Sequence, residues 1–215
     1  MVSVEVKQEL AYARWESATW ADYQRLRDDP TIERVQLFFA HNRLLVENMG
    51  WEGILHSEIR ELLSAVLTLW LLRHPDMKSK LLGSCLMERE GLQAAAPDIA
   101  LYMGECLPQY QASRRIDLNQ CPPPALVVEV ADTTLDSDLD QKKHLYAALG
   151  VPEYWVIDAQ GGRVFMFTLA EGSYQRVESS ATLPGVTAAL LEATIAQAQS
   201  GTNIAAAAWF AQQLS

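Results

Sequence analysis

Cysteine is scarce in this sequence of 215 residues. Only Cys85, Cys106 and Cys121 are present, and no two of them form a C-x-x-C pair. An odd number of widely separated cysteines indicates neither a zinc knuckle nor a disulfide framework. The sequence also lacks a P-loop, a dinucleotide-binding fingerprint and a G-x-S-x-G elbow. We therefore expect three buried, reduced thiols and a functional site built from other side chains.

Long apolar runs are absent as well. The longest, residues 62–72 (LLSAVLTLWLL), ends at Arg73-His74 and is too short to span a bilayer. The first ten residues, MVSVEVKQEL, carry Glu and Lys where a signal peptide would need an apolar run. These observations predict a cytoplasmic protein with no membrane-spanning segment, and the run at 62–72 is better interpreted as part of a buried helix.

Positive charge is also in short supply. The sequence contains 17 Lys and Arg against 27 Asp and Glu, so its formal net charge is -10. Proteins that bind nucleic acids through phosphate contacts usually present a basic surface, and the acidic balance counts against such a partner. A local basic patch is still compatible with it, because net charge says nothing about how the charges are distributed.

No repeat, charge run or linker divides the sequence, and its length suits one substantial core. We predict a single domain over residues 1–215, with a short helical extension at 1–30 and a helical tail at 187–215. The order of apolar patterns predicts an α/β protein, an α+β mixed sheet with helices on its faces. The predicted helices are about 20–26, 56–73 and 138–149, and the predicted strands are 34–39, 43–47, 81–88, 97–103, 125–131, 153–158, 164–168 and 174–179.

Several local signals support these elements. Thr19 resembles a helix N-cap, Ser137 and Asp140 can form a capping box, and Gly150 can close the helix that follows. The strand pairs 34–39 with 43–47 and 153–158 with 164–168 are typical of hairpins. Residues 125–131 (ALVVEVA) are apolar on both faces except at Glu129, which is the profile of a central strand covered on both sides.

Two acidic residues interrupt this apolar pattern. An ionised carboxylate at Glu129 is costly in a buried strand unless it is paired or bound to a metal ion, and a salt bridge to a covering helix would explain it equally well. Asp98 follows Pro97, and proline marks a strand start, a bulge or an edge, where a side chain is often re-aimed beside an active site. Taken alone, Asp98 could be an ordinary turn aspartate.

A lysine occupies the apolar face of the predicted helix at 138–149. At about 100° per residue, Lys142 falls near the middle of that face, whereas Lys143 lies about a quarter-turn away. We therefore predict that Lys142 points towards the sheet, with Glu129 as its most economical partner, and that Lys143 points to solvent. Lysine can also extend to the edge of an apolar surface, so this placement does not by itself establish a function. The apolar residues of the face are Leu139, Leu145, Tyr146 and Leu149.

Two carboxylates and a lysine that converge at the end of a central strand can form a hydrolytic site. Carboxylate oxygens bind Mg²⁺ or Mn²⁺, which polarises a phosphoryl oxygen and lowers the pKa of a bound water. The ammonium can orient that water or stabilise the charge that develops in the transition state.

Three motifs accompany these positions: Pro97-Asp98, VVEV at 127–130, and DLDQKKHLYAALGVPEYWVID at 138–158. Together they resemble the Uma2 family, also called DUF820, of the PD-(D/E)XK restriction-endonuclease-like superfamily. The resemblance extends more loosely over most of the chain. It implies a restriction-endonuclease-like core, a four- or five-stranded mixed sheet with flanking helices, in which Asp98 and Glu129 are metal ligands.

The sequence departs from the strict superfamily pattern after Glu129. The lysine expected two residues later is Ala131, and the resemblance implies that Lys142 on the following helix takes its place, which agrees with the helix-face argument. Asp132-Thr133 stands where relatives often have Ser-Pro, so a role for Asp132 as an extra ligand stays open. Glu58 could be an additional acid, although a surface position is favoured, and His56 is interpreted as the start of its helix.

Two functional hypotheses follow. The first is a Mg²⁺- or Mn²⁺-dependent endonuclease-like phosphodiesterase that acts on nucleic acid, with DNA favoured over RNA, as a homodimer whose two sites can address two strands. The second is a catalytically silent interaction or assembly protein that retains the nuclease fold. The set Asp98, Glu129 and Lys142 favours the first and the acidic balance favours the second, while the fold alone decides neither.

Overall fold

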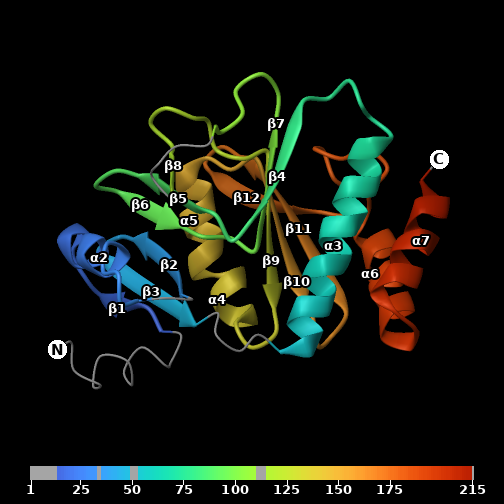
Figure 1. Cartoon of the computed structure of the whole chain (residues 1–215), viewed down its shortest axis with the longest axis horizontal. Helices are drawn as coiled ribbons and strands as arrows, with labels where there is room; N and C mark the ends of the chain where they lie inside the picture. The colour runs from blue at the N-terminus through green and yellow to red at the C-terminus, as the bar shows by residue number, and fades with distance from the viewer. Residues whose placement is uncertain (1–13, 33–34, 49–52, 110–114, 215) are drawn as a thin grey trace.

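The computed structural model describes residues 14–32, 35–48, 53–109 and 115–214, and the strands of these segments form two six-stranded sheets (Figure 1). The order in sheet A is β1 (Glu16–Ser17), β3 (Arg43–Asn48), β2 (Val35–Ala40), β6 (Gln93–Ala95), β5 (Leu86–Arg89) and β8 (Arg115–Asp117). The order in sheet B is β12 (Ser173–Val177), β11 (Arg163–Ala170), β10 (Glu153–Asp158), β9 (Leu126–Ala131), β7 (Ile99–Met103) and β4 (Ser79–Gly83).

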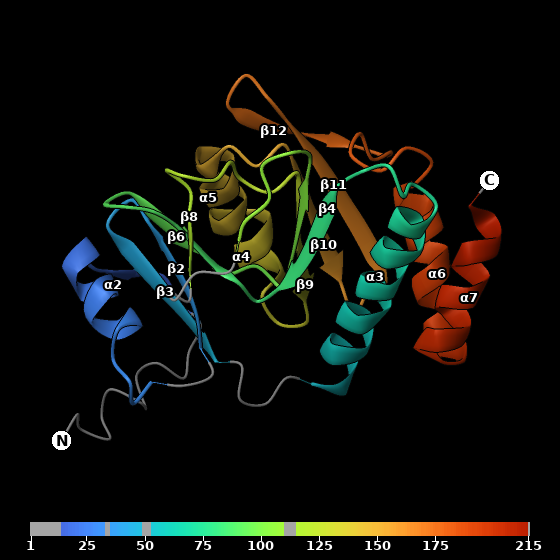
Figure 2. The same cartoon turned by 45° about the horizontal axis from the view of Figure 1, so that its top comes forward.

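Sheet B is the central layer of the molecule (Figures 1 and 2). One face packs against α3 (Ile54–Leu72), α6 (Ala188–Ser200) and α7 (Asn203–Gln213), and the other faces α4 (Leu135–Leu139), α5 (Gln141–Leu149) and sheet A. Helix α2 (Trp20–Arg27) covers the outer face of sheet A. The mixed α+β fold class is confirmed, and the second sheet is an addition to the single sheet that the sequence predicts.

Strand β9 runs through the middle of sheet B, between β7 and the parallel neighbour β10, and all six of its residues are buried. Alternate side chains of a strand point to opposite faces. Leu126, Val128 and Val130 belong to the cluster under α3 and α6, whereas Val127 and Ala131 belong to the cluster under α5 and sheet A. Glu129 therefore faces α5 and sheet A. The predicted central strand is confirmed.

Most of the predicted elements are confirmed within one or two residues. Thr19 caps α2 through a capping box with Asp22, and Gly150 ends α5 with a φ of 79°. The β2–β3 hairpin turns at His41 and Asn42, whose φ values of 51° and 54° match the left-handed pair that a tight two-residue hairpin requires. Residue 34, the predicted start of that hairpin, lies outside the described residues. The division into domains stays a prediction.

Two predicted elements are each divided in the structure. The predicted strand 81–88 breaks at Ser84, whose φ of 48° turns the chain out of β4 in sheet B and into β5 in sheet A. The predicted helix 138–149 becomes α4 and α5, broken at Asp140. The hydroxyl of Tyr154 donates to the carbonyl of Asp138, which a continuous helix would have paired with the N–H of Lys142. The predicted Ser137–Asp140 capping box is wrong, because α4 begins at Leu135 with Thr134 as its N-cap and Ser137 lies inside the helix.

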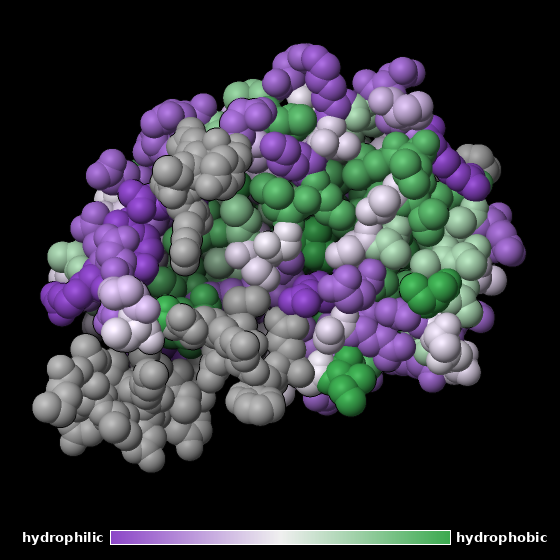
Figure 3. Space-filling model, viewed as in Figure 1, coloured by the Kyte–Doolittle hydropathy of each residue, from purple (hydrophilic) through white to green (hydrophobic). Residues whose placement is uncertain are grey.

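Two further expectations concern membrane-spanning segments and the burial of the three cysteines. Within the described residues no helix is long and apolar enough to cross a membrane. Figure 3 shows an apolar area over α3 and β4, and the exposed apolar side chains of this region include Leu72 and Met77. The expectation of three buried thiols is wrong, because Cys106 is exposed and Cys85 and Cys121 are half-buried.

Candidate active site

Asp98 lies directly before β7, and antiparallel pairing with β9 aligns it with Glu129. Ile99 pairs with Val128 at the end of the β7–β9 ladder. Continuing the antiparallel pairing by one residue on each strand places Asp98 opposite Glu129. Residues opposite one another in an antiparallel pair share a face of the sheet, with Cβ atoms about 4.5–5.5 Å apart. The Asp98 carboxylate also accepts a hydrogen bond from the backbone N–H of Val130 at 2.8 Å. Both acids are almost fully buried.

Lys142 reaches the same place from α5. It is 1 % exposed, and its Nζ lies 3.6 Å from Glu129 Oε2. The helix-face prediction for Lys142 is therefore confirmed. Lys143 is half-buried rather than exposed, because its Nζ lies 4.2 Å from the centre of the Phe167 ring.

The two closest partners of Lys142 come from residues that the sequence argument did not select. Its Nζ lies 2.9 Å from Glu47 Oε2 and 2.9 Å from Asp138 Oδ1. Glu47 is on β3. Asp138 is near the end of α4, four residues before Lys142 in the sequence. Glu47 interrupts the apolar run Leu44-Leu45-Val46 much as Glu129 interrupts β9, so the buried-charge argument could have found it.

Sheet A supplies a second contact to the site through β2. Gln36 pairs with Glu47 across the β2–β3 hairpin, and its Nε2 lies 3.4 Å from Asp98 Oδ1. His56, in the first turn of α3, places Nε2 3.3 Å from Asp98 Oδ2. The helix begins at Ile54, two residues before the predicted start at His56, and His56 contacts the predicted metal ligand. The site is thus assembled where the two sheets and helices α3, α4 and α5 meet.

Two hydroxyl groups hold the acidic side chains in place. Tyr146 donates to Glu129 Oε1 at 2.5 Å, and Thr134 donates to Asp138 Oδ2 at 2.6 Å. Tyr146 lies one helical turn after Lys142, so α5 contributes both the cation and a donor that orients Glu129. Because buried polar groups are costly without partners, these bonds reduce the cost of concentrating charge here.

The other two acids considered from the sequence lie apart from these contacts. Asp132 accepts hydrogen bonds from the side chain of Gln160 at its carbonyl, at 3.0 Å, and at Oδ1, at 2.9 Å. Glu58 is half-buried on α3. In the described part of the chain neither is among the ion-pair partners of Lys142.

The surroundings push the pKa values of the two predicted ligands in opposite directions. Burial raises the pKa of Glu129 well above its ordinary value, and the charges of Asp98, Asp138 and Glu47 raise it further against the opposing effect of Lys142. Burial would also raise the pKa of Asp98. The hydrogen bond and charge of His56, with the N–H of Val130, outweigh it and lower that pKa. Carboxyl pairs whose pKa values are pushed apart are typical of acid–base sites.

Lys142 keeps its charge in this environment. Burial would lower the pKa of its ammonium, but the charges of Glu129, Asp138 and Glu47 raise that pKa well above its ordinary value. Burial raises the pKa of Glu47 despite the opposing charge of Lys142. The buried acids therefore outnumber the cation that they surround, and an added positive charge would relieve their mutual repulsion.

The donors at this site suit a hard divalent cation in part. Glu47 Oε1 is buried and has no hydrogen-bond partner within the described residues, which leaves a carboxylate oxygen available beside the lysine. Among residues 14–32, 35–48, 53–109 and 115–214, no group of three or more His, Cys, Asp or Glu side chains is arranged to hold a metal ion. Mg²⁺ usually takes only one or two carboxylates, completing its shell with water and substrate phosphate, so the pair Asp98 and Glu129 is compatible with it.

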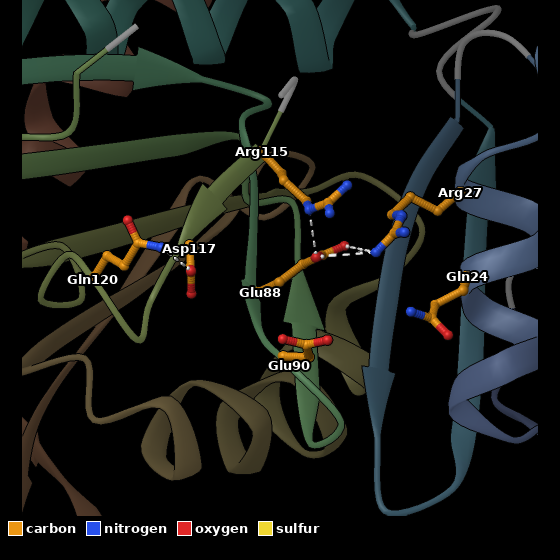
Figure 4. A pocket seen from close by; sticks show the side chains of 7 residues that line it. All are labelled: Gln24, Arg27, Glu88, Glu90, Arg115, Asp117 and Gln120. Atoms are coloured by element: carbon orange, nitrogen blue, oxygen red, sulfur yellow. Dashed lines mark hydrogen bonds and ion pairs between the residues drawn. The ribbon is translucent and has the colours of Figure 1, made fainter. Parts of the chain in front are cut away.

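A separate cluster of charges lies on the opposite face of sheet A (Figure 4). Glu88 on β5 is buried and accepts from the Arg27 guanidinium at 3.0 and 3.1 Å, from Arg115 Nε at 2.9 Å and from the Tyr23 hydroxyl. Arg27, Glu88 and Arg115 border a cavity of about 240 Å³. The Glu88 carboxylate accepts hydrogen bonds from side chains of both α2 and β8. This cluster therefore holds α2 against sheet A.

Comparisons with known proteins agree with this architecture. A model of the Uma2 family, described as "Putative restriction endonuclease", matches residues 20–202. Among solved structures, the chain is similar to "a putative nuclease belonging to DUF820" from Anabaena variabilis, with a TM-score of 0.57 and 14 % sequence identity over 79 % of this chain and 93 % of that chain. At this identity the likeness shows the fold alone, and the expected nuclease-type fold is confirmed. No curated protein matches the chain.

Proposed function

The chain belongs to the Uma2 family, and from this premise we propose that it is a divalent-metal-dependent phosphodiesterase that cleaves nucleic acid at Asp98, Glu129 and Lys142. The observation that carries the proposal is the convergence of these three buried, charged side chains from β7, β9 and α5. Burying so much charge is expensive, and a fold selected for stability alone would fill this space with apolar side chains.

In the proposed reaction Asp98 and Glu129 hold the metal ion. When bound, Mg²⁺ or Mn²⁺ would polarise the phosphoryl oxygen and lower the pKa of a coordinated water. Asp98 is prepared for this role because the contacts from His56 and Val130 keep its carboxylate ionised. Tyr146 holds Glu129 in one orientation. Because burial raises the pKa of Glu129, metal binding would compete with protonation of this carboxyl group.

Lys142 stabilises the negative charge that develops on the phosphate during cleavage. Its ammonium is fixed between Glu47 and Asp138, so it needs no reorganisation when that charge appears. Glu47 and Asp138 act as positioning residues for Lys142, and His56 acts as a positioning residue for Asp98. This assignment explains why the lysine can lie on a helix rather than two residues after Glu129 on the strand.

A basic pocket beside the site supports nucleic acid as the partner despite the acidic net charge. A cavity of about 460 Å³ is lined by Arg14 and Arg43, by Trp15, by three hydroxyl side chains and one amide, and by one acid, Asp136. Thr134 belongs to this lining and also donates to Asp138, the partner of Lys142. Arginine and hydroxyl groups are common phosphate ligands, and an aromatic ring can stack on a base.

We favour DNA as the substrate and a homodimer as the active form, so that two sites can address two strands. The exposed apolar area over α3 and β4 supports self-association, since such patches commonly mark protein interfaces. Light scattering on the purified protein measures the dimer directly, and Leu72→Glu should reduce its mass to that of the monomer if this area is the interface.

The cleavage assay tests the proposal. Purified protein should cut DNA or RNA with Mg²⁺ or Mn²⁺ and lose this activity on addition of a chelator. Asp98→Asn and Glu129→Gln should each abolish cleavage while circular dichroism shows an intact fold, because each removes a charged metal ligand. Lys142→Ala should lower the rate roughly 10²- to 10³-fold, whereas the neighbouring Lys143→Ala should leave the chemical step unchanged.

The acidic net charge favours one alternative, a silent protein that keeps the nuclease fold for interaction or assembly. Wild-type protein that binds Mn²⁺ by calorimetry yet cleaves no single- or double-stranded DNA or RNA would support this alternative. Equal cleavage rates for wild type, Asp98→Asn and Glu129→Gln would overturn the proposed site, since the activity would then not depend on either carboxylate.

A further inference from the structure

Two of the cysteines that are distant in the sequence meet in the fold. Cys106 lies in the segment after β7, and Cys121 lies in the segment between β8 and β9. The Cys121 thiol donates to the carbonyl oxygen of Cys106 at 3.9 Å. Burial raises the pKa of the Cys121 thiol, and the charge and side chain of Cys106 raise that pKa further. Among the described residues, no hydrogen bond joins the third cysteine, Cys85, to either of them.

We propose that Cys106 and Cys121 form a reversible intramolecular disulfide when the protein meets hydrogen peroxide. A disulfide needs Cα atoms about 4.4–6.8 Å apart and sulfur atoms that can approach to about 2.05 Å. The contact of the Cys121 thiol with the Cys106 carbonyl places the two residues side by side, so that rotation about Cα–Cβ can bring the sulfurs towards each other. The backbone of Cys121 is itself fixed by a turn, in which its N–H donates to the carbonyl of Asp117 at 2.9 Å.

The exposure of the two thiols assigns their order in the reaction. Cys106 is exposed, so its thiolate attacks peroxide first, becoming a sulfenic acid as the peroxide O–O bond breaks and one water forms. The thiolate of Cys121 then attacks this sulfur and displaces the hydroxyl group as a second water. Two thiols are oxidised and one peroxide is reduced to two waters. Cys121 is half-buried, which suits the resolving thiol better than the attacking one.

The bond would join the far end of β7 to the segment that leads into β9. Asp98 precedes the first residue of β7, whereas Cys106 follows its last residue, so the disulfide forms at the end of the strand away from the site. It closes a loop of about 15 residues, for which the entropic gain corresponds to an increase in Tm of roughly 6–12 °C in a chain of this size. The bond should therefore stabilise the fold and leave metal binding unchanged.

Peptide mapping by mass spectrometry under non-reducing conditions tests this inference. After treatment of the full chain with hydrogen peroxide, a peptide pair linked through Cys106 and Cys121 should appear, and dithiothreitol should remove it. Cys106→Ser and Cys121→Ser should each abolish the linked pair and the rise in Tm, whereas Cys85→Ser should retain both.

Three results would overturn the proposal. One is the conversion of Cys106 to sulfinic or sulfonic acid with no linked pair. Another is a bond that includes Cys85, and the third is a dimer linked between two chains through Cys106. None of these readouts depends on nuclease activity, so failure of the thiol proposal and failure of the proposed function are distinguishable.

Discussion

Replacement of Lys142 by methionine tests the central feature of the site, one buried cation surrounded by three carboxylates. Methionine retains much of the length and apolar volume of the side chain but removes the ammonium, which lies 2.9, 2.9 and 3.6 Å from Glu47, Asp138 and Glu129. Removing one partner of a buried ion pair costs about 3–5 kcal/mol. We expect about 3 kcal/mol, the lower end, because Glu129 already has a raised pKa and can take up a proton in response.

The pH dependence of this loss gives a second, independent check. Without the ammonium, which opposes the effect of burial, the folded-state pKa values of Glu129 and Glu47 rise further. A carboxyl group with a raised folded pKa favours folding below its unfolded pKa, about 4, and opposes folding as pH rises through the folded value. The deficit of the variant should therefore be largest at pH 8 and smaller at pH 5. The stabilisation that accompanies the raised pKa of Lys142 is fully present below the unfolded pKa of about 10.4 and changes with pH only above that value, outside this window.

Urea unfolding, followed by tryptophan fluorescence at pH 8 and pH 5, measures both quantities, and urea leaves the ionic strength unchanged. Lys143→Met is the matched control. Lys143 is half-buried and interacts with the face of Phe167, so its loss should cost at most about 1 kcal/mol. The reasoning is refuted if Lys142→Met loses less than about 1 kcal/mol at pH 8, or if its deficit is the same at both pH values.

Two other substitutions test the charge balance elsewhere. Glu129→Gln should leave the free energy of unfolding at pH 8 equal to or above that of wild type, because the raised pKa of Glu129 makes its ionised form costly in the fold. The difference should vanish towards pH 4. A loss above about 1 kcal/mol in urea unfolding would contradict this. Glu88→Gln should cost about 2–3 kcal/mol in the same assay, because Arg27 and Arg115 lose their shared carboxylate. The control Glu90→Gln, at an exposed position, should cost little. Equal losses in the two variants would refute a structural role for the Glu88 cluster.

The proposed cleavage activity and the thiol pair can be examined on the same purified protein. Metal-dependent cleavage depends on Asp98, Glu129 and Lys142, whereas peroxide-dependent stabilisation depends on Cys106 and Cys121. Oxidised wild-type protein should therefore bind Mn²⁺ as the reduced protein does, which calorimetry measures. A loss of metal binding on oxidation would show that the far end of β7 is coupled to Asp98.

The strongest features of the fold were predictable because they are local. The apolar run of β9 and the capping box at Thr19 are written in neighbouring residues, and so is the inward face of α5 that carries Lys142. The periodicities of 2.0 and 3.6 residues determine which side of an element is buried, and a charge on that side is conspicuous. That is why Glu129 and Lys142 could be selected before any coordinates were known.

Tertiary structure decided the rest. Glu47 and Asp138 become partners of Lys142 only because sheet A packs against the α5 face of sheet B, a contact between residues 95 positions apart in the case of Glu47. The same packing divides the predicted strand at Ser84, whose positive φ turns the chain into sheet A, and the predicted helix at Asp140, where the Tyr154 hydroxyl takes the place of a helical hydrogen bond to the Asp138 carbonyl. It also brings Cys106 and Cys121 together. The sequence by itself determined which side chains are inward and charged, and long-range packing determined which of them meet, because that depends on contacts that no local periodicity encodes.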